Sequence, residues 1–207
     1  MIARRRPVER GSSRLFVAVE LPTHIQDALG ATIERLRAEL GGAFRWVSPA
    51  AIHLTLKFLG DVGPERVPAL TTALESAAVA VEPFELRLEG SGVFPNRRSP
   101  SVVWAGIGGD AAAIEALRQA VELAMTGAGE AAETRTFRPH LTLARVRGRL
   151  EPSEAEALAA RLGRVDHARV LPFRVDGVSL MQSELDRGGA SYARLGRATL
   201  GAVSSAD

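Results

Sequence analysis

Short apolar runs alternate along the chain with longer segments in which apolar residues recur every three or four positions. Leu15 to Val19 is a continuous apolar run of the length typical of a buried strand. Thr23 to Leu40 has the helical period and is followed by Gly41-Gly42, a common helix stop. Strands and helices in this mixed order predict an α+β protein. The same criteria predict further strands at residues 52–59, 84–88, 101–107, 141–146, 170–175, 178–181 and 192–200, and further helices at residues 64–79, 111–125 and 153–162.

The two ends of the chain lack this pattern. Residues 1–13 are rich in arginine and contain proline, glycine and serine but few apolar residues, so we expect a disordered basic leader. Residues 201–207 are expected to form a frayed tail. The predicted elements between them form one continuous series, and we expect a single domain over residues 14–200.

Composition narrows the class of protein. Hydrophobic residues make up 46% and charged residues 24% of the 207 residues, which is ordinary for a soluble globular protein. No apolar run approaches the roughly 18 residues of a membrane span. The absence of cysteine excludes disulfides, thiolate metal sites and cysteine nucleophiles. We expect a cytoplasmic, monomeric protein that does not associate with membranes.

A tetrapeptide is repeated in the sequence. His-Leu-Thr-Leu occurs at residues 53–56 and again at residues 140–143, 87 positions later. Each copy stands at the start of a predicted strand and is preceded by a helical segment. Two of the four histidines of the chain fall in this repeat, which chance alone rarely produces. The spacing predicts two copies of a β-α-β lobe.

The repeat has a chemical logic. Alternate side chains of a strand share a face, so His53 and Thr55 point one way on one strand, as His140 and Thr142 do on the other. Two imidazoles can serve as general base and general acid in one reaction near neutral pH. Threonine hydroxyls can donate hydrogen bonds to the non-bridging oxygens of a phosphate. A single histidine at a strand start is usually a surface residue without a role, and the duplication is what favours function.

Metal chemistry has little support in the sequence. Neither repeated histidine has a further His, Asp or Glu at ligand spacing, which disfavours a zinc or two-metal centre. We expect no metal and no cofactor.

Arginine is concentrated beside the second copy. The 26 basic residues of the chain include one lysine, Lys57. Residues 134–150 hold five arginines and no acid, which indicates either a solvated basic face or a wall that attracts an anion. On a regular strand Lys57 shares the face of His53, where it would help to hold an anion. Arg145 faces away from His140 on a regular strand and joins it only where the strand ends or bulges.

The remaining aromatic and histidine residues carry less information. Trp46, Phe58 and Tyr192 are candidates to stack on a base, but packing in the core or at its rim is the default interpretation of each. His24 and His167 lie outside the repeat, and we assign them no role.

Longer strings around the repeat resemble a known family. Trp46-Val47 with residues 52–60 (IHLTLKFLG) is similar to the first motif of the bacterial and archaeal RNA 2′,3′-cyclic phosphodiesterases, also called 2′-5′ RNA ligases. Residues 137–145 (FRPHLTLAR) are similar to the second motif. This family belongs to the two-histidine (2H) phosphoesterase superfamily, and the resemblance covers about residues 14–200.

The resemblance implies a fold and a reaction. The fold is bilobal, with two pseudo-symmetric lobes that each hold an antiparallel sheet and helices, and with the active cleft between them. The reaction is the metal-independent opening of a 2′,3′-cyclic phosphate at the end of an RNA or nucleotide to a 2′-phosphomonoester, together with reversible 2′-5′ RNA ligation. By analogy His53 is the proton donor and His140 the proton acceptor, while Thr55, Thr142 and Arg145 bind the substrate.

Two alternative functions stay open at this point. A 2H phosphodiesterase of the same fold can act on another small cyclic phosphate or on a 2′-5′ oligonucleotide. A non-catalytic RNA-binding module would use the basic leader and residues 134–150, and it would bind RNA in a salt-dependent manner without turnover. The matched histidine pair argues against the second alternative, because binding alone needs no paired acid and base.

Overall fold

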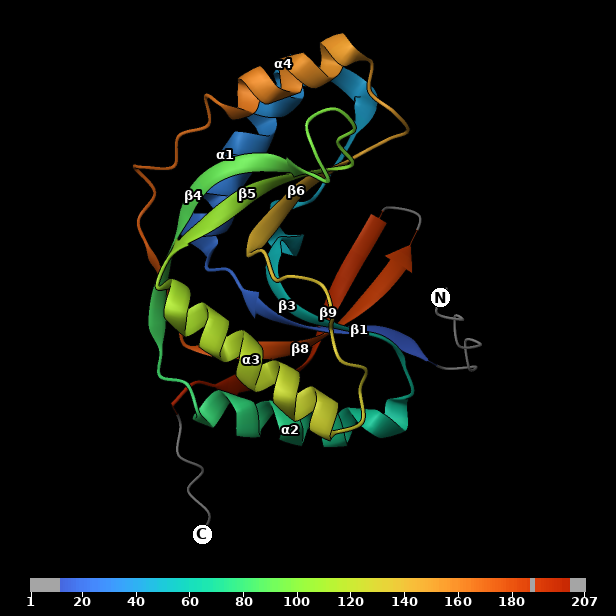
Figure 1. The fold of residues 1–207 in the computed structure, drawn as a ribbon, viewed down its shortest axis with the longest axis vertical. Coiled ribbons are helices and arrows are strands. Elements are labelled where there is room, and N and C mark those ends of the chain that lie inside the picture. The colour runs from blue at the N-terminus through green and yellow to red at the C-terminus, as the bar shows by residue number, and fades with distance from the viewer. Residues whose placement is uncertain (1–11, 187–188, 202–207) are drawn as a thin grey trace.

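A computed structural model describes residues 12–186 and 189–201, and the predicted alternation of strands and helices is present throughout this part of the chain (Figure 1). Residues 1–11 of the predicted leader and 202–207 of the predicted tail lie outside the described residues. The elements are β1 (Ser13–Glu20), α1 (Thr23–Leu40), β2 (Phe44–Trp46), β3 (His53–Val62), α2 (Val67–Val79), β4 (Phe84–Phe94), β5 (Val102–Gly109), α3 (Ala111–Gly127), β6 (His140–Val146), α4 (Pro152–Leu162), β7 (Phe173–Val175), β8 (Gly177–Asp186) and β9 (Gly189–Thr199).

In the described part of the chain, nine strands form one curled antiparallel sheet. The strands follow the order β7-β4-β5-β6-β3-β1-β8-β9, and β2 pairs with β6. We call β3, β1, β8 and β9 the His53 half, and β7, β4, β5, β6 and β2 the His140 half. The two halves meet where Leu54 on β3 lies opposite Leu141 on β6. The first residues of the two repeated tetrapeptides therefore flank the junction.

The helices cover the two halves in pairs. Figure 1 shows α2 and α3 together beside the His53 half, and α1 and α4 together over the His140 half. Apart from the short β2 between α1 and β3, the order β1-α1-β3-α2-β4 is repeated as β5-α3-β6-α4-β7. The predicted α+β class with two pseudo-symmetric lobes of antiparallel sheet and helices is thus confirmed, and the two sheets join at the Leu54–Leu141 pair into one.

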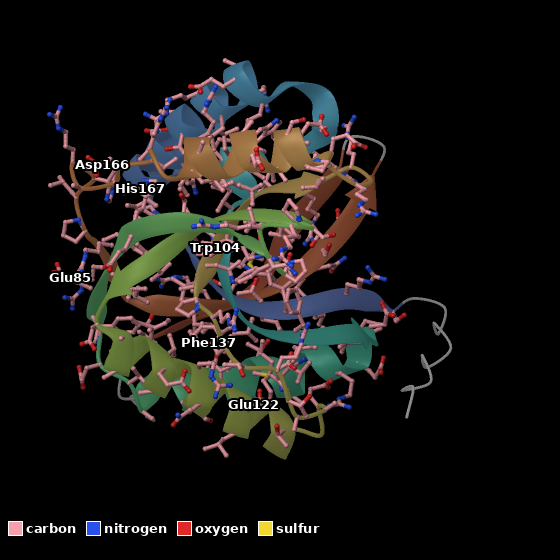
Figure 2. The ribbon with its side chains drawn as sticks, turned by 45° about the horizontal axis from the view of Figure 1, so that its top comes forward. Glu85, Trp104, Glu122, Phe137, Asp166 and His167 are labelled. Carbon is pink, nitrogen blue, oxygen red and sulfur yellow. The ribbon has the colours of Figure 1, made fainter. Side chains whose placement is uncertain are left out.

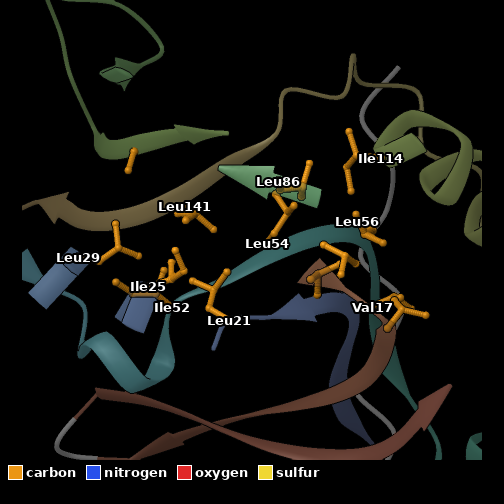
Figure 3. Close-up of a cluster of buried hydrophobic side chains, with 14 of the residues drawn as sticks. Val17, Leu21, Ile25, Leu29, Ile52, Leu54, Leu56, Leu86, Ile114 and Leu141 are labelled. Atoms are coloured by element: carbon orange, nitrogen blue, oxygen red, sulfur yellow. The ribbon is translucent and has the colours of Figure 1, made fainter. Parts of the chain in front are cut away.

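The leucines of the repeat hold the junction in the main core. Leu54 and Leu141 are fully buried, and Leu56 and Leu143 are buried beside them. Figure 3 shows Leu54 and Leu141 close to Ile25 of α1. A smaller cluster of Phe16, Ala18 and Met181, with Tyr192 packed against it, lies apart from this core. We call the face of the sheet that is turned away from the main core the site face.

Two further observations concern single elements. The three-residue strand β2 was not predicted, because three residues are too few to show a period. Among the described residues, no helix combines the length and the apolar composition that crossing a lipid bilayer requires.

Candidate active site

The structure brings the four repeated polar side chains together. His53 and His140 begin β3 and β6, directly beside the register pair that joins the two halves of the sheet. Continuing this antiparallel register by one residue in each direction sets His53 opposite Thr142 and His140 opposite Thr55. All four lie on the site face, since the leucines between them are buried in the core. No hydrogen bond joins either threonine hydroxyl to another described residue.

The two imidazole rings are held in the same way. The Nδ1 atom of His53 lies 2.9 Å from the carbonyl oxygen of Ala51, and the Nδ1 atom of His140 lies 2.6 Å from that of Arg138. Each carbonyl belongs to the residue two positions earlier in the chain. A carbonyl only accepts, so both Nδ1 atoms donate. The Nε2 atom of each ring is therefore the nitrogen that gains or loses a proton.

Aromatic side chains enclose His53. Its ring stacks on Phe16 with centroids 4.6 Å apart and meets the edge of Tyr192 at 4.8 Å. Burial lowers the pKa of His53 below its ordinary value, because it disfavours the charged ring. The hydrogen bond to the Ala51 carbonyl and the charge of Glu20 raise the pKa of His53 in part, and the charge of His140 lowers it.

Glu20 is the acidic residue beside this ring. It lies on β1 opposite His53 in the strand register. Its carboxylate accepts a hydrogen bond of 2.6 Å from the buried Ser179 hydroxyl and pairs with the Arg194 guanidinium at 3.3 Å. The sequence analysis did not predict Glu20 as a site residue. Glu20 lies on a different strand from His53, and only the order of the strands in the sheet brings the two residues together.

The surroundings of His140 differ from those of His53. The residue opposite His140 in the register is Gly106 on β5, where His53 has a carboxylate. The ring meets the edge of Phe94 at 4.9 Å, and Phe94 lies 5.3 Å from Trp104, which Figure 2 places on the sheet. Trp104 in turn lies opposite Thr142. The two histidines thus share a ring orientation but differ in the residues beside them.

A β-bulge falls at the last residue of each tetrapeptide. On β3, Thr55 lies opposite Ala18 and Lys57 opposite Val17, so that Leu56 is an extra residue. On β6, Leu143 is extra in the same way, between the partners of Trp104 and Val103. A bulge shifts the alternation of side chains by one position. It therefore turns the next pair of residues, Phe58 and Arg145, toward the site face.

The expectation that Lys57 helps to hold an anion beside His53 is wrong. Lys57 is 2% exposed. Its ammonium donates to Glu122 and to the Ala131 carbonyl, each at 2.8 Å. Figure 2 shows Glu122 on α3. The bulge has turned Lys57 to the core side, where it ties α3 and the following segment to β3.

Arg145 reaches the site face through the second bulge, and it is exposed there. Arg45, which was not predicted from the sequence, lies opposite Arg145 on β2. Arg135 is instead neutralised, because it pairs with Glu133 and lowers the pKa of that carboxyl to about 2. The basic segment is therefore not uniformly available for an anion.

Trp46 and Tyr192 fall where the default interpretation of core or rim packing places them, whereas Phe58 does not. Trp46 packs with Phe44 against the main core, and Tyr192 packs at the rim of His53. Phe58 is 59% exposed on the site face. His24 is exposed on α1, and His167 is buried in the loop after α4. Among the described residues, no group of three or more His, Cys, Asp or Glu could hold a metal ion.

An α+β sheet that carries two symmetrically placed histidines, each followed two residues later by a threonine, defines a two-histidine phosphoesterase. The family model of the 2′-5′ RNA ligase superfamily matches residues 25–187, and the chain belongs to this family.

Relatives with curated names and solved structures agree with this assignment. An RNA 2′,3′-cyclic phosphodiesterase of Methanothermobacter thermautotrophicus is 33% identical over 179 residues, which cover 86% of this chain and 94% of the relative. One of Thermus thermophilus is 34% identical over 90% of each chain. A crystal structure of a Thermus thermophilus protein has a TM-score of 0.71 at 31% identity, over 90% of this chain and 97% of that one. E. coli LigT in complex with 3′-AMP has a TM-score of 0.68 at 28% identity, over 91% and 98%.

Proposed function

We propose that this protein hydrolyses the 2′,3′-cyclic phosphodiester at the end of an RNA or nucleotide to a 2′-phosphomonoester. The observation that carries the proposal is the paired geometry of His53 and His140. Each ring has an Nε2 atom without a hydrogen bond to another described residue, on the site face beside a threonine and across the junction of the two halves. The names of the relatives and the nucleotide in the complex of E. coli LigT support the same substrate class.

The proposed reaction is an in-line displacement at phosphorus. The Nε2 atom of His140 takes a proton from the attacking water, whose oxygen forms a new bond to phosphorus. The bond from phosphorus to the 3′-oxygen breaks, and the Nε2 atom of His53 delivers its proton to that oxygen. Each histidine leaves the cycle in the other's protonation state, so both exchange protons with solvent before the next turnover. When the 5′-hydroxyl of a second RNA takes the place of water, the same sequence forms a bond from that oxygen to phosphorus and releases the 3′-oxygen, which gives a 2′-5′ linkage and accounts for ligation; reversing this step cleaves the linkage.

The other site residues bind the phosphate in this proposal. The hydroxyls of Thr55 and Thr142 donate to its two non-bridging oxygens. Both hydroxyls lack partners among the described residues, and both lie beside the histidines. Arg145, the next residue on the site face after Thr142, supports the phosphate or the nucleotide with its guanidinium. No step uses a metal ion.

The first test is hydrolysis of a nucleoside 2′,3′-cyclic phosphate in the presence of EDTA, with the product identified by phosphorus NMR. We expect a 2′-phosphate from the wild type and none from His53→Ala or His140→Ala, with both variants folded by circular dichroism. A 3′-phosphate would contradict the assignment of the leaving group. Loss of wild-type activity in EDTA would contradict the metal-free mechanism, and no turnover with or without EDTA would contradict the function.

The single domain over residues 14–200, the monomeric state and the cytoplasmic location stay predictions. Size-exclusion chromatography with light scattering tests the monomeric state directly.

A further inference from the structure

Two strands at the margin of the His140 half have nearly the same sequence but different partners. Strand β2 reads Phe-Arg-Trp and β7 reads Phe-Arg-Val, and in both the central arginine is exposed. On β7, Arg174 lies opposite Glu85, an ordinary pairing of opposite charges. On β2, Arg45 lies opposite Arg145. One of two similar strands thus places like charges side by side.

Arg45 and Arg145 both lie on the site face. Phe44 and Trp46 on either side of Arg45 pack against the main core, so the side chain between them turns the other way. Arg145 reaches this face through the bulge at Leu143. Two exposed arginines therefore occupy neighbouring positions on the face that carries the histidines.

Neither arginine is neutralised by the described part of the protein. No carboxylate of the described residues forms an ion pair with Arg45 or Arg145. Like charges directly opposite each other destabilise a sheet. An anion bound between them removes this repulsion, and the planar fork of arginine matches the oxygens of a phosphate. The pair thus has the chemistry of a phosphate-binding site.

The position of the pair identifies which phosphate it fits. The register partners of Thr142 and Arg145 on β5 are Trp104 and Val102, two residues apart, so the two side chains stand roughly 7 Å apart along the strand. Arg45 lies one strand further, about 5 Å from Arg145. The path from Thr142 runs along β6 to Arg145 and then across to Arg45 on β2. It leads from the place of the reacting phosphate to the margin of the sheet.

We propose that Arg45 and Arg145 form a binding subsite for the internucleotide phosphate on the 5′ side of the nucleotide that carries the cyclic end. The subsite makes the enzyme prefer a strand of RNA over a free nucleoside cyclic phosphate. This inference rests on the proposed function, which supplies the strand and its orientation. It adds Arg45 as a specificity-determining residue.

Three substrates test the subsite. The first is a nucleoside 2′,3′-cyclic phosphate, and the second is a dinucleotide that ends in the same group. The third is that dinucleotide with a neutral methylphosphonate linkage. We expect the wild type to have a higher kcat/KM for the charged dinucleotide than for the other two. In Arg45→Gln this preference falls by about tenfold, the scale of a hydrogen bond to a charged group.

Arg174→Gln is the matched control. Its arginine has the same place in a three-residue strand and the same exposure, but an acidic partner. We expect it to keep the wild-type preference for the charged dinucleotide. The salt dependence gives a second readout, because loss of one phosphate contact makes kcat/KM for the charged dinucleotide fall less steeply with rising salt.

The outcomes separate the subsite from the proposed function. A wild type that turns over all three substrates, with the same preference in Arg45→Gln, contradicts the subsite alone. An equal loss of preference in Arg174→Gln also contradicts it, because the effect would then be one of general charge. A wild type that turns over none contradicts the proposed function and the subsite with it. The melting temperature of each variant shows whether it is folded. Because Arg45→Gln removes a repulsion between like charges, we expect its melting temperature not to fall below that of the wild type.

Discussion

His53 and His140 occupy equivalent places in the two halves of the sheet, yet the strands beside them differ. Each ring donates from Nδ1 to the carbonyl two residues earlier, and each begins a strand with the same bulge. Opposite His53 stands the carboxylate of Glu20, whereas opposite His140 stands Gly106. The repeated scaffold holds two imidazoles in the same way, and these are the two proton-transfer groups of the proposed mechanism. The unequal neighbours provide a physical basis for giving them different tasks.

The residues beyond the bulge diverge in the same manner. On the site face, Phe58 of one half corresponds to Arg145 of the other. On the core side, Lys57 corresponds to Ala144, a buried apolar residue, so the buried ion pair of Lys57 with Glu122 is not repeated at that position. The backbone geometry is thus duplicated, and the side chains next to it are specialised for stability on one strand and for charge on the other.

The largest effect on the rate is expected when one of the two histidines is removed, and a substrate that needs no proton donor then shows which task that histidine performs. Loss of a proton-transfer group lowers the rate by roughly 10²–10⁴-fold, so His53→Ala and His140→Ala are both strongly impaired on the natural cyclic phosphate. A cyclic phosphate with sulfur in place of the 3′-bridging oxygen releases a thiolate, which needs no proton. We expect this substrate to restore most of the activity of His53→Ala and none of that of His140→Ala, as measured by thiol release.

The inverse pattern would exchange the two roles. Rescue of His140→Ala but not of His53→Ala would make His140 the proton donor. Rescue of both variants or of neither would show that the two histidines do not act as one proton donor and one proton acceptor. The rate of the wild type on each substrate is the reference, because the sulfur substrate differs in intrinsic reactivity from the oxygen substrate.

The second-largest effect is expected on stability, from the buried ion pair of Lys57 that only one of the two halves contains. Lys57→Met takes the ammonium away from the Glu122 carboxylate and the Ala131 carbonyl, and removing one member of a buried pair costs about 3 kcal/mol. We expect the free energy of unfolding in urea to fall by this amount, while kcat of the folded variant is unchanged, because Lys57 faces away from the histidines. Arg87→Gln breaks an exposed pair with Glu89 and should cost less than about 1 kcal/mol.

A result in which Lys57→Met lowers kcat but not stability would return Lys57 to the site. It would also contradict the direction in which the bulge turns this strand.

The case of Lys57 shows how far the sequence alone could predict this site. The apolar periods and the repeated tetrapeptide were enough for every helix and strand except the short β2, for two repeated lobes and for the gathering of His53, Thr55, His140 and Thr142 on one face. Up to Thr55 the strand is regular, so alternation gave the correct face. A bulge inserts one residue without a turn signal, and every side chain after it changes sides.

The site residues on neighbouring strands could not be predicted from the sequence for a different reason. Glu20 and Arg45 join the site through the strand order of the sheet and its register, which depend on the packing of the whole chain. Nothing in the local sequence of β1 distinguishes Glu20 from an exposed residue at a strand end. For Arg45, the strand β2 is itself too short to be predicted. Residues near in space but far apart in sequence were therefore the ones that could not be predicted.

The smallest effect is expected from Glu20→Gln, and it bears most directly on the difference between the two histidines. Burial lowers the pKa of His53, while the hydrogen bond to the Ala51 carbonyl and the charge of Glu20 oppose this. The amide of glutamine can still accept from Ser179, so the contact is kept and the charge is lost. The pKa of His53 then falls further, because the charge that favours the protonated ring is gone. Asp61→Asn, which removes an exposed acid on β3, is the control.

The sign of this shift decides which task His53 performs. A proton donor acts only in its protonated form, so activity is lost as pH rises through its pKa, and Glu20→Gln should move the alkaline limb of kcat/KM to lower pH. If His53 were the acceptor, the acidic limb would move instead. The two rings influence each other, so the limbs report the pair, and NMR titration of the His53 ring in both proteins assigns the shift to one site. An unchanged profile together with an unchanged titration would mean that Glu20 serves only to bind Ser179 and Arg194, and that the asymmetry between the halves has another source.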